Sequence, residues 1–204
     1  LFCAFLVVVD DANSCCAGYT YVNVDDAWAG PRGKDGIPTW DNRTFPAGIP
    51  ALAAAVHALN LSFGIYTDRA AKTCGGRTGS FGHESIDPAT YAQWGVDYVK
   101  EDSCGATHEH QGAFAEYAKF QAGINATNRS MFFSLCGWMR YYAAAGRRGI
   151  GQSWRVGADC DSWDDFLLNV DAAAATAPLA AAGAFNVSRL LLSVDPNPTA
   201  NPSW

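Results

Sequence analysis

The sequence predicts an α/β fold built on a parallel sheet, and three features lead to this expectation. Short runs of apolar, β-branched and aromatic residues recur, and each is followed by a Gly- or Asp-containing loop and an Ala-rich stretch with helical spacing. Successive runs begin about 22 to 43 residues apart, which leaves room for a crossover helix between parallel strands. The length of 204 residues corresponds to about one domain.

Each expected element follows from its residue types. The strands are short and rich in the β-branched and aromatic residues that fit a pleated sheet, except for the last, which is richer in Ala. The helices are Ala-rich and have apolar residues at helical spacing. In chain order we expect a strand at residues 19–24, a helix at 49–59, a strand at 62–67, a helix at 88–94, a strand at 96–100, a helix at 111–123, strands at 131–135 and 153–156, a helix at 163–175 and a strand at 180–185.

Composition excludes several classes of protein. Hydrophobic residues make up 49% of the chain and charged residues 17%, so the chain can bury a sizeable core. A net charge of −6 without a basic stripe argues against a nucleic-acid partner. The most hydrophobic run, residues 1–9, is too short to cross a bilayer, so we expect no membrane span and interpret the run as a buried element.

Cysteines and glycosylation sequons favour an oxidising compartment. The seven cysteines form no CxxC pair, which argues against a zinc site or a thioredoxin motif. Chance supplies roughly one or two N-x-[ST] sequons in a chain of this length, and this chain has more. We therefore expect a glycoprotein that is secreted or lysosomal or vacuolar. The sequons lie at Asn42, Asn60, Asn125, Asn128 and Asn186.

Polar residues gather where the expected strands end. In parallel α/β folds the reactive groups lie at the carboxyl ends of the strands, and the clusters here occupy that position. The chain contains no glycine-rich nucleotide fingerprint, no P-loop and no nucleophile elbow, so we expect neither nucleotide chemistry nor a serine hydrolase and no cofactor. The clusters are Asp25 and Asp26, Asp68, residues 100–102 and residues 155–161.

Lys100 and Asp102 are candidates for a nucleophilic site. Strand alternation puts both side chains on the same face at a strand end. A nearby ammonium group favours the ionised carboxylate that a nucleophile needs, and we expect the ammonium itself to bind hydroxyls. An ordinary solvated ion pair is the alternative.

The segment around Asp159 is a candidate for a general acid. Trp154 and Trp163 flank a loop that holds Arg155 and Asp159, and an aspartate beside apolar surface can retain its proton. The alternative is helix capping by the residues just before Trp163, which are Asp161 and Ser162.

The segment from Asp25 to Trp28 offers two acids and an indole that suit a sugar. The acids are hydrogen-bond acceptors and Trp28 is a candidate stacking face, whereas the alternative is a solvated acidic turn. We expect no metal site, because this pair supplies too few oxygen ligands and the His108, Glu109, His110 run is too closely spaced for zinc.

Six motifs occur in one order along the chain, at residues 21–28 (YVNVDDAW), 44–49 (TFPAGI), 64–68 (GIYTD), 72–74 (KTC), 94–100 (WGVDYVK) and 134–136 (SLC). Together they resemble the α-galactosidases (melibiases) of glycoside hydrolase family 27, and the resemblance covers about residues 18–163. It implies an incomplete (β/α)8 TIM barrel of about six β-α units, with residues 1–204 forming one partial catalytic domain that lacks the family's C-terminal β-sandwich.

The same resemblance implies an activity and its residues. The family removes terminal α-D-galactosyl groups with retention of configuration, through a covalent glycosyl-aspartate intermediate, so the expected partner is a carbohydrate with a terminal α-galactoside. Asp102 matches the family's nucleophile and Asp159 its acid/base. Cys74 and Cys104 match a disulfide between neighbouring loops. The sugar-binding positions match Asp25, Asp26, Tyr66, Lys100 and Arg155.

Departures from the family pattern leave alternatives open. Gly137 stands where α-galactosidases usually have a Glu that contacts the 2-hydroxyl, and α-N-acetylgalactosaminidases have a small residue there. Glu101 replaces an aromatic residue and should point away from Asp102 along the strand. The motifs of the family's first strand and last loop have no close counterpart. An α-N-acetylgalactosaminidase, another related α-glycosidase or an inactive sugar-binding fragment therefore remain alternatives.

Overall fold

Six parallel strands form one sheet. The computed structural model describes residues 19–105, 110–137, 149–160 and 162–187. Within these ranges the strands lie in the order β1-β2-β3-β4-β5-β6, and each pair of neighbours is parallel. The strands are β1 (Tyr21–Asn23), β2 (Ser62–Asp68), β3 (Tyr98–Asp102), β4 (Phe132–Cys136), β5 (Ser153–Arg155) and β6 (Phe185–Val187).

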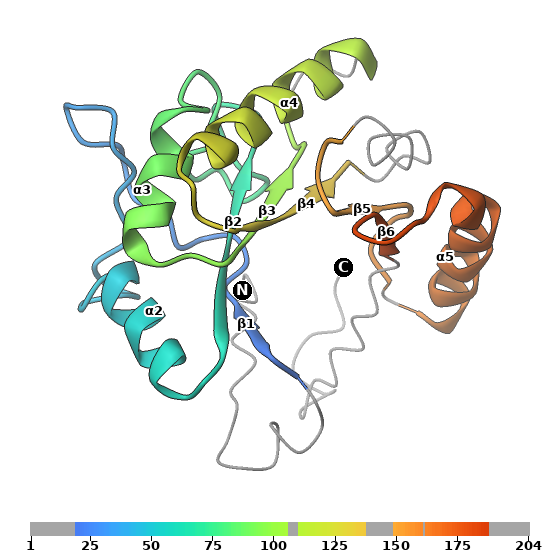
Figure 1. Cartoon of the computed structure of the whole chain (residues 1–204), viewed down its shortest axis with the longest axis horizontal. Coiled ribbons are helices and arrows are strands. Elements are labelled where there is room, and N and C mark those ends of the chain that lie inside the picture. Colours follow the sequence, from blue (N-terminus) through green and yellow to red (C-terminus); the bar gives the residue numbers. More distant parts are fainter. Residues whose placement is uncertain (1–18, 106–109, 138–148, 161, 188–204) are drawn as a thin grey trace.

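Helices lie around the periphery and the strands lie at the centre (Figure 1). Consecutive strands that are neighbours in space and are joined by such crossovers are the arrangement of a (β/α)8 barrel. The expectation of an incomplete barrel with six units is therefore confirmed. The helices are α2 (Ile49–Ala58), α3 (Ile86–Trp94), α4 (His110–Ala126) and α5 (Trp163–Thr176), followed by the 3-10 helix η3 (Ala177–Leu179).

Local sequence explains where the helices begin and end. Pro50 lies in the first turn of α2, where its missing N–H costs nothing. Gly95 ends α3 in the left-handed conformation, with a φ of 83°. The side chain of Ser162 accepts a hydrogen bond from the backbone N–H of Asp165 and caps α5, which confirms one of the expected caps. Asp161, the other expected cap, lies outside the described residues.

One face of the sheet packs against the helices. Alternate residues of the central strands, including Phe63, Val99 and Phe133, are fully buried on this face. The ring of Phe120 from α4 stacks on Phe133 with centroids 5.3 Å apart, and Tyr117 meets the same ring at 6.2 Å. Burial of each such side chain contributes about 1.5–3 kcal/mol. This packed layer holds the ends of the strands in place, and it therefore positions the residues that follow them.

The sequence predicts a strand toward one end of the chain and a buried element at the other. The last strand was expected at residues 180–185 but lies at Phe185–Val187, so this prediction was wrong in its bounds. The Ala-rich segment instead continues α5 into η3, and a turn with Gly183 at a φ of 74° pairs Ala181 with Ala184. The buried element expected at residues 1–9 lies outside the described residues. Among the described residues, none of the helices has the length and apolar character needed to cross a membrane.

Candidate active site

Asp102 is the last residue of β3 and lies at the centre of the candidate site. Its side chain is nearly fully buried. The Tyr66 hydroxyl donates to Oδ2 at 3.0 Å, and the Ser103 backbone N–H donates to Oδ1 at 2.8 Å. Burial raises the pKa of Asp102, whereas Lys100, the Ser103 N–H and Tyr66 act in the opposite direction. The carboxylate is thus held in one orientation by groups that favour its ionised form.

Tyr66 is fixed as a hydrogen-bond donor to Asp102. It is 2% exposed, and burial together with the nearby Asp102 raises the pKa of its hydroxyl far above the usual value. The Trp28 indole N–H donates to the backbone carbonyl of Tyr66 at 2.7 Å and holds this part of β2. Trp28 itself is buried edge-on against Tyr91 and Trp94, so the expectation that its face stacks on a sugar was wrong.

Lys100 connects β3 to the loop after β1. Its ammonium lies 2.8 Å from Asp25 Oδ2 and 4.9 Å from the centroid of the Tyr66 ring. Burial lowers the pKa of Lys100, but Cys136, Asp25 and Asp102 outweigh this and raise it above the usual value. Lys100 thus has a carboxylate partner across the sheet, and an ammonium group with three donors keeps capacity for the hydroxyls that it is expected to bind. The pair offers both donors and acceptors to a ligand.

Asp26 organises the loop beside the site. Its Oδ2 accepts a hydrogen bond from the Gly75 backbone N–H at 2.7 Å, and its Oδ1 accepts one from the Ala27 N–H at 2.6 Å. A Cβ atom built on Gly75 would lie 3.0 Å from Asp26 Oδ2, so a side chain there would crowd the contact. Asp26 thus joins the loop after β1 to the loop after β2, which carries Cys74.

The expected disulfide between Cys74 and Cys104 is present. Its sulfurs are 2.02 Å apart and its Cα atoms 5.0 Å apart. The two sulfurs and the carboxylates of Asp68 and Asp102 form a compact cluster. Because the sulfurs are bonded to each other, the cluster offers no thiolate to a metal ion.

Asp68 is a site residue that the sequence analysis did not assign. It ends β2, pairs in register with Asp102 and is fully buried. Its two oxygens accept hydrogen bonds from the backbone N–H groups of Ala70 at 2.8 Å and Cys104 at 2.9 Å. Burial raises its pKa to about 8, and the charge of Asp102 adds to that effect. Its place at the end of the GIYTD motif was the available signal.

Arg155 and Asp159 form an ion pair on the other side of the site. Arg155 Nη2 lies 2.7 Å from Asp159 Oδ1, and Arg155 Nε donates to the Gly157 carbonyl at 2.8 Å. Asp159 was expected in an apolar environment between tryptophans. Its side chain is instead 58% exposed, so that expectation was wrong, because the ion pair holds the carboxylate at the edge of the site.

Cys136 joins the two halves of the site and was also missed as a functional residue. It lies beside Asp102 in the sheet register, and its sulfur accepts a hydrogen bond from Arg155 Nη1 at 3.7 Å. The structure therefore brings Asp25, Tyr66, Lys100 and Asp102 together and links them through Cys136 to Arg155 and Asp159. Asp26 lies beside this group, on the loop after β1, and accepts a hydrogen bond from Gly75 on the loop that carries Cys74. The available signal for Cys136 was its place in the SLC motif.

Glu101 points away from the site, as expected. It is fully buried in the layer under the helices, and neither of its carboxyl oxygens has a hydrogen-bond partner in the part of the chain that the structure describes. Burial raises its pKa well above the usual value, and the nearby Asp68 and Glu84 add to the effect. Burial therefore favours the neutral form of Glu101.

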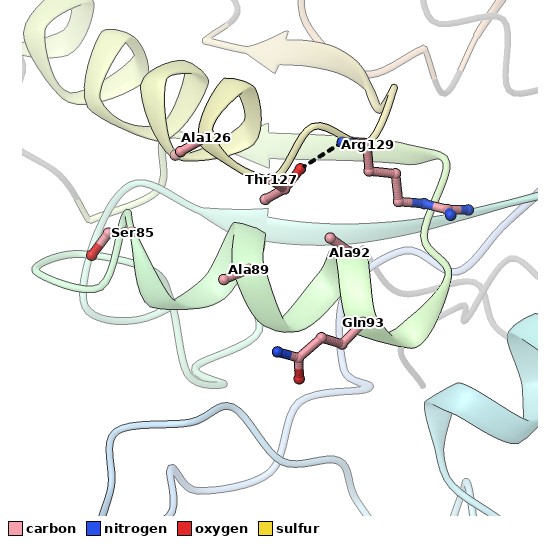
Figure 2. A pocket seen from close by; sticks show the side chains of 8 residues that line it. Ser85, Ala89, Ala92, Gln93, Ala126, Thr127 and Arg129 are labelled. Atoms are coloured by element: carbon pink, nitrogen blue, oxygen red, sulfur yellow. Dashed lines mark hydrogen bonds between the residues drawn. The ribbon is translucent and has the colours of Figure 1, made fainter.

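A separate groove of about 440 Å³ lies between α3 and α4 (Figure 2). Small side chains such as Ala89, Ala92 and Ala126 line much of it. Arg129 at its rim is engaged by the carbonyl of Val96 and the carboxylate of Asp97. None of the candidate site residues lines this groove.

Comparison with known proteins assigns the chain to a family. The melibiase family described as alpha galactosidase A matches residues 3–197. A "Probable alpha-galactosidase" from Dictyostelium discoideum is 46% identical over 171 residues, which are 83% of this chain and 44% of that protein. "Alpha-galactosidase A" from Cellvibrio japonicus is 43% identical over 143 residues, 70% of this chain and 35% of that protein.

The solved structures agree with this assignment. The α-galactosidase from Saccharomyces cerevisiae superimposes with a TM-score of 0.75 at 28% identity, over 85% of this chain and 46% of that one. The chain spans less than half the length of these three proteins. With the fold, the disulfide and the strand-end residues in place, the chain belongs to the α-galactosidases (melibiases) of glycoside hydrolase family 27.

Proposed function

We propose that the protein is a retaining glycoside hydrolase that removes terminal α-D-galactosyl residues. The observation that carries the proposal is the chain of contacts from Tyr66 to Asp102, across Cys136 to Arg155, and on to Asp159. This chain of contacts supports a site that contains two carboxyl groups in different environments. A retaining glycosidase needs such a pair, one ionised to attack and one protonated to donate. Family membership supports the α-galactoside as substrate.

The first step forms a covalent intermediate. An ionised oxygen of Asp102 attacks the anomeric carbon, a C–O bond forms to the aspartate, and the bond to the leaving group breaks. The leaving-group oxygen takes the proton of Asp159, which becomes a carboxylate. Tyr66 and the Ser103 N–H hold the Asp102 oxygens in line for attack. The charge that develops on Asp159 is balanced by Arg155, 2.7 Å away.

The second step releases the sugar. Asp159, now a carboxylate, accepts a proton from a water molecule, and the water oxygen attacks the anomeric carbon. The bond to Asp102 breaks, and the product leaves with the configuration of the substrate. Partial exposure of Asp159 supports this role, because the residue must meet both a leaving group and water.

Charged and polar groups around Asp102 are assigned to substrate binding. The Lys100 ammonium and the Asp25 carboxylate present a donor and an acceptor 2.8 Å apart, which suits vicinal hydroxyls. Asp26 has acceptor capacity beyond its two backbone contacts, because a carboxylate has about four lone-pair sites. Arg155 completes the binding groups on the Asp159 side.

We extend the proposal to the compartment. The disulfide between Cys74 and Cys104 is of a kind that persists in oxidising surroundings, which supports a secreted or a lysosomal or vacuolar protein. Exposed sequon residues such as Asn42, Asn60 and Asn128 are accessible to an N-glycan.

The proposal is tested by hydrolysis with the full-length protein. An aryl α-galactoside should be cleaved at least 100-fold faster than the matched β-galactoside, whose leaving group is equatorial, or the matched α-glucoside, whose 4-hydroxyl has the opposite configuration. Proton NMR of the first product should show the α-anomer, as retention requires. A fluorinated α-galactosyl donor should label Asp102, detected by peptide mass spectrometry.

Two results would overturn the assignment. Formation of the β-anomer as the first product would mean inversion and would remove the nucleophilic role of Asp102. Labelling of a different carboxylate, or unchanged labelling in Asp102→Asn, would do the same.

A further inference from the structure

Cys136 occupies a central position between charged residues. It is the last residue of β4, lies next to Asp102 in the sheet register and is 2% exposed. It is a free cysteine, in contrast to Cys74 and Cys104. A buried cysteine at a strand end is usually a small apolar core residue. The contacts of Cys136 are of another kind.

The Cys136 thiol has a polar partner on either side. It makes a side-chain hydrogen bond to the carboxyl group of Asp102. Its sulfur accepts a hydrogen bond from Arg155 Nη1 at 3.7 Å, while Nη2 of the same guanidinium lies 2.7 Å from Asp159 Oδ1. One sulfur atom is therefore interposed between the residue proposed as nucleophile and the cation that serves the residue proposed as acid/base.

The protonation state of this thiol is fixed by its surroundings. Burial, reinforced by the charge of Asp102, raises the pKa of Cys136 to about 12. The sulfur therefore keeps its proton at any pH at which a glycosidase of this kind works, and S–H is a donor to the Asp102 carboxylate. Its lone pairs remain for Arg155. The arrangement also keeps the guanidinium on the Asp159 side, where Asp159 and the Gly157 carbonyl hold it.

We propose that Cys136 is a positioning residue that orients Asp102 for attack and holds Arg155 toward Asp159. The inference rests on the proposed function and assigns a role to a residue that acts through Asp102 and Arg155. The thiol stabilises the ionised form of Asp102 by donating to it, and the sulfur separates that carboxylate from the positive charge of Arg155.

The test compares Cys136→Ala with Cys136→Ser in the full-length protein. Alanine removes the donor, so the pKa of Asp102 rises and the acid limb of kcat/KM moves to higher pH, by about half a pH unit to one pH unit. We expect kcat to fall about tenfold with little change in KM, because the loss concerns orientation in the transition state. Serine keeps a donor and an acceptor in place and should restore the wild-type acid limb.

Ser134→Ala is the matched control. Ser134 lies two residues earlier on the same face of β4 and shares a hydrogen bond of 2.8 Å with the Ser153 hydroxyl. Its replacement removes a buried polar contact of the same strand without touching Asp102 or Arg155. It should lower the melting temperature and leave the pH profile unchanged. An equal shift of the acid limb in Ser134→Ala would show that Cys136 has only a structural role.

Carboxyl ¹³C NMR of Asp102 separates this inference from the proposed function. The resonance is assigned with Asp102→Asn, and its titration is followed in wild type and in both Cys136 variants without substrate. A higher titration midpoint in Cys136→Ala that serine reverses supports the inference even if no α-galactoside is hydrolysed, in which case only the proposed function fails. An unchanged midpoint in a folded Cys136→Ala overturns the inference, whatever the activity.

Discussion

Lys100 and Asp25 form an ion pair of 2.8 Å across the sheet, although 75 positions separate them in the sequence. The contact joins the end of β3 to the loop after β1, which is not its neighbour in the sheet. Both side chains are only partly exposed, so the pair is less screened by solvent than a surface pair. It therefore sets the position of the ammonium group beside Asp102 as well as the charge available to a sugar.

Asp25→Asn should weaken substrate binding and chemistry together. The amide keeps the shape but removes the charge that holds Lys100, so the ammonium is free to turn toward Asp102. We expect kcat/KM to fall on the order of 10- to 100-fold, the effect of a hydrogen bond to a charged group. Steady-state kinetics with an aryl α-galactoside measure it. Asp35→Asn, at an exposed aspartate outside the site, is the control and should match wild type.

Removal of the disulfide should destabilise the protein. Cys74 and Cys104 are 30 positions apart, and closing a loop of this length in the unfolded chain is worth about 3–4 kcal/mol. The double variant Cys74→Ser, Cys104→Ser should therefore unfold at lower denaturant concentration, and reductant should no longer affect its midpoint. Chemical unfolding with and without reductant tests this. Equal midpoints for wild type with and without reductant would contradict the prediction.

The order of the strands and helices was predictable because each depends on local pattern. Strands β2 and β4 contain β-branched or aromatic residues, β3 begins with Tyr98 and Val99, and the helices between these strands contain several alanines. The bounds of β6 were not predictable, since its Ala-rich approach fits helix and turn equally well. Pairing with β5 determines which residues form β6, and the local sequence does not reveal that pairing.

The site was predictable where a residue type is itself informative. Tyr66 belongs to the GIYTD motif and Asp102 follows the WGVDYVK motif by two residues, and their contact follows once β2 and β3 are paired. The partner of Lys100 was not predictable, because it comes from the loop after β1, a strand that is not adjacent to β3. Asp68 was noted only as a polar residue at a strand end and Cys136 only as part of the SLC motif, since their roles depend on contacts with other strands.

Gly137→Glu should change the preference for the sugar. Gly137 directly follows β4 and is buried beside Cys136, at the position where the family usually has a Glu near the 2-hydroxyl. The longer side chain should fill the space that a 2-acetamido group needs, so the ratio of activity on an α-N-acetylgalactosaminide to that on an α-galactoside should fall at least tenfold. Parallel assays of the two substrates measure the ratio. Gly137→Ala, which is too short to reach, should leave it nearly unchanged, and an unchanged ratio with Glu would show that this position does not face the 2-substituent.

Asp102 should set the acid limb of the pH-rate profile. Burial raises its pKa above that of an ordinary aspartate, and it must be ionised to attack, so kcat/KM should rise as the pH passes through that raised value. The raised pKa also makes the stability of the folded protein depend on pH. The folded state binds the proton more tightly than the unfolded chain, so this contribution is fully present below a pH of about 4 and is lost as the pH rises through the folded-state pKa.

Asp102→Asn should therefore abolish turnover while raising the melting temperature at neutral pH. The amide cannot ionise, which removes both the nucleophile and the stability loss. Calorimetry at pH 4 and pH 7 with parallel assays tests the pair of effects. A variant that kept ordinary activity would remove Asp102 from the mechanism, and a lower melting temperature at pH 7 would contradict the linkage.

Glu101 should limit stability at neutral and alkaline pH. It is fully buried without a hydrogen-bond partner in the described part of the chain, and burial raises its pKa well above the usual value. Asp68, Glu84 and Asp87 raise the pKa further, and Arg69 acts against them. Stability from the neutral form is complete below a pH of about 4.3, the ordinary value for Glu, and is lost as the pH rises toward the folded-state pKa.

Glu101→Gln should remove that loss, because the amide has nearly the same shape and cannot ionise. The variant should be close to wild type near pH 4 and more stable by at least about 1 kcal/mol at pH 8, since ionisation places an unpaired charge in the layer under the helices. Urea unfolding at pH 4, 6 and 8 measures the difference. Asp171→Asn, at an exposed aspartate of α5, should show no such dependence. A constant difference between Glu101→Gln and wild type across this range would mean that the pKa of Glu101 is the same in the folded and the unfolded protein.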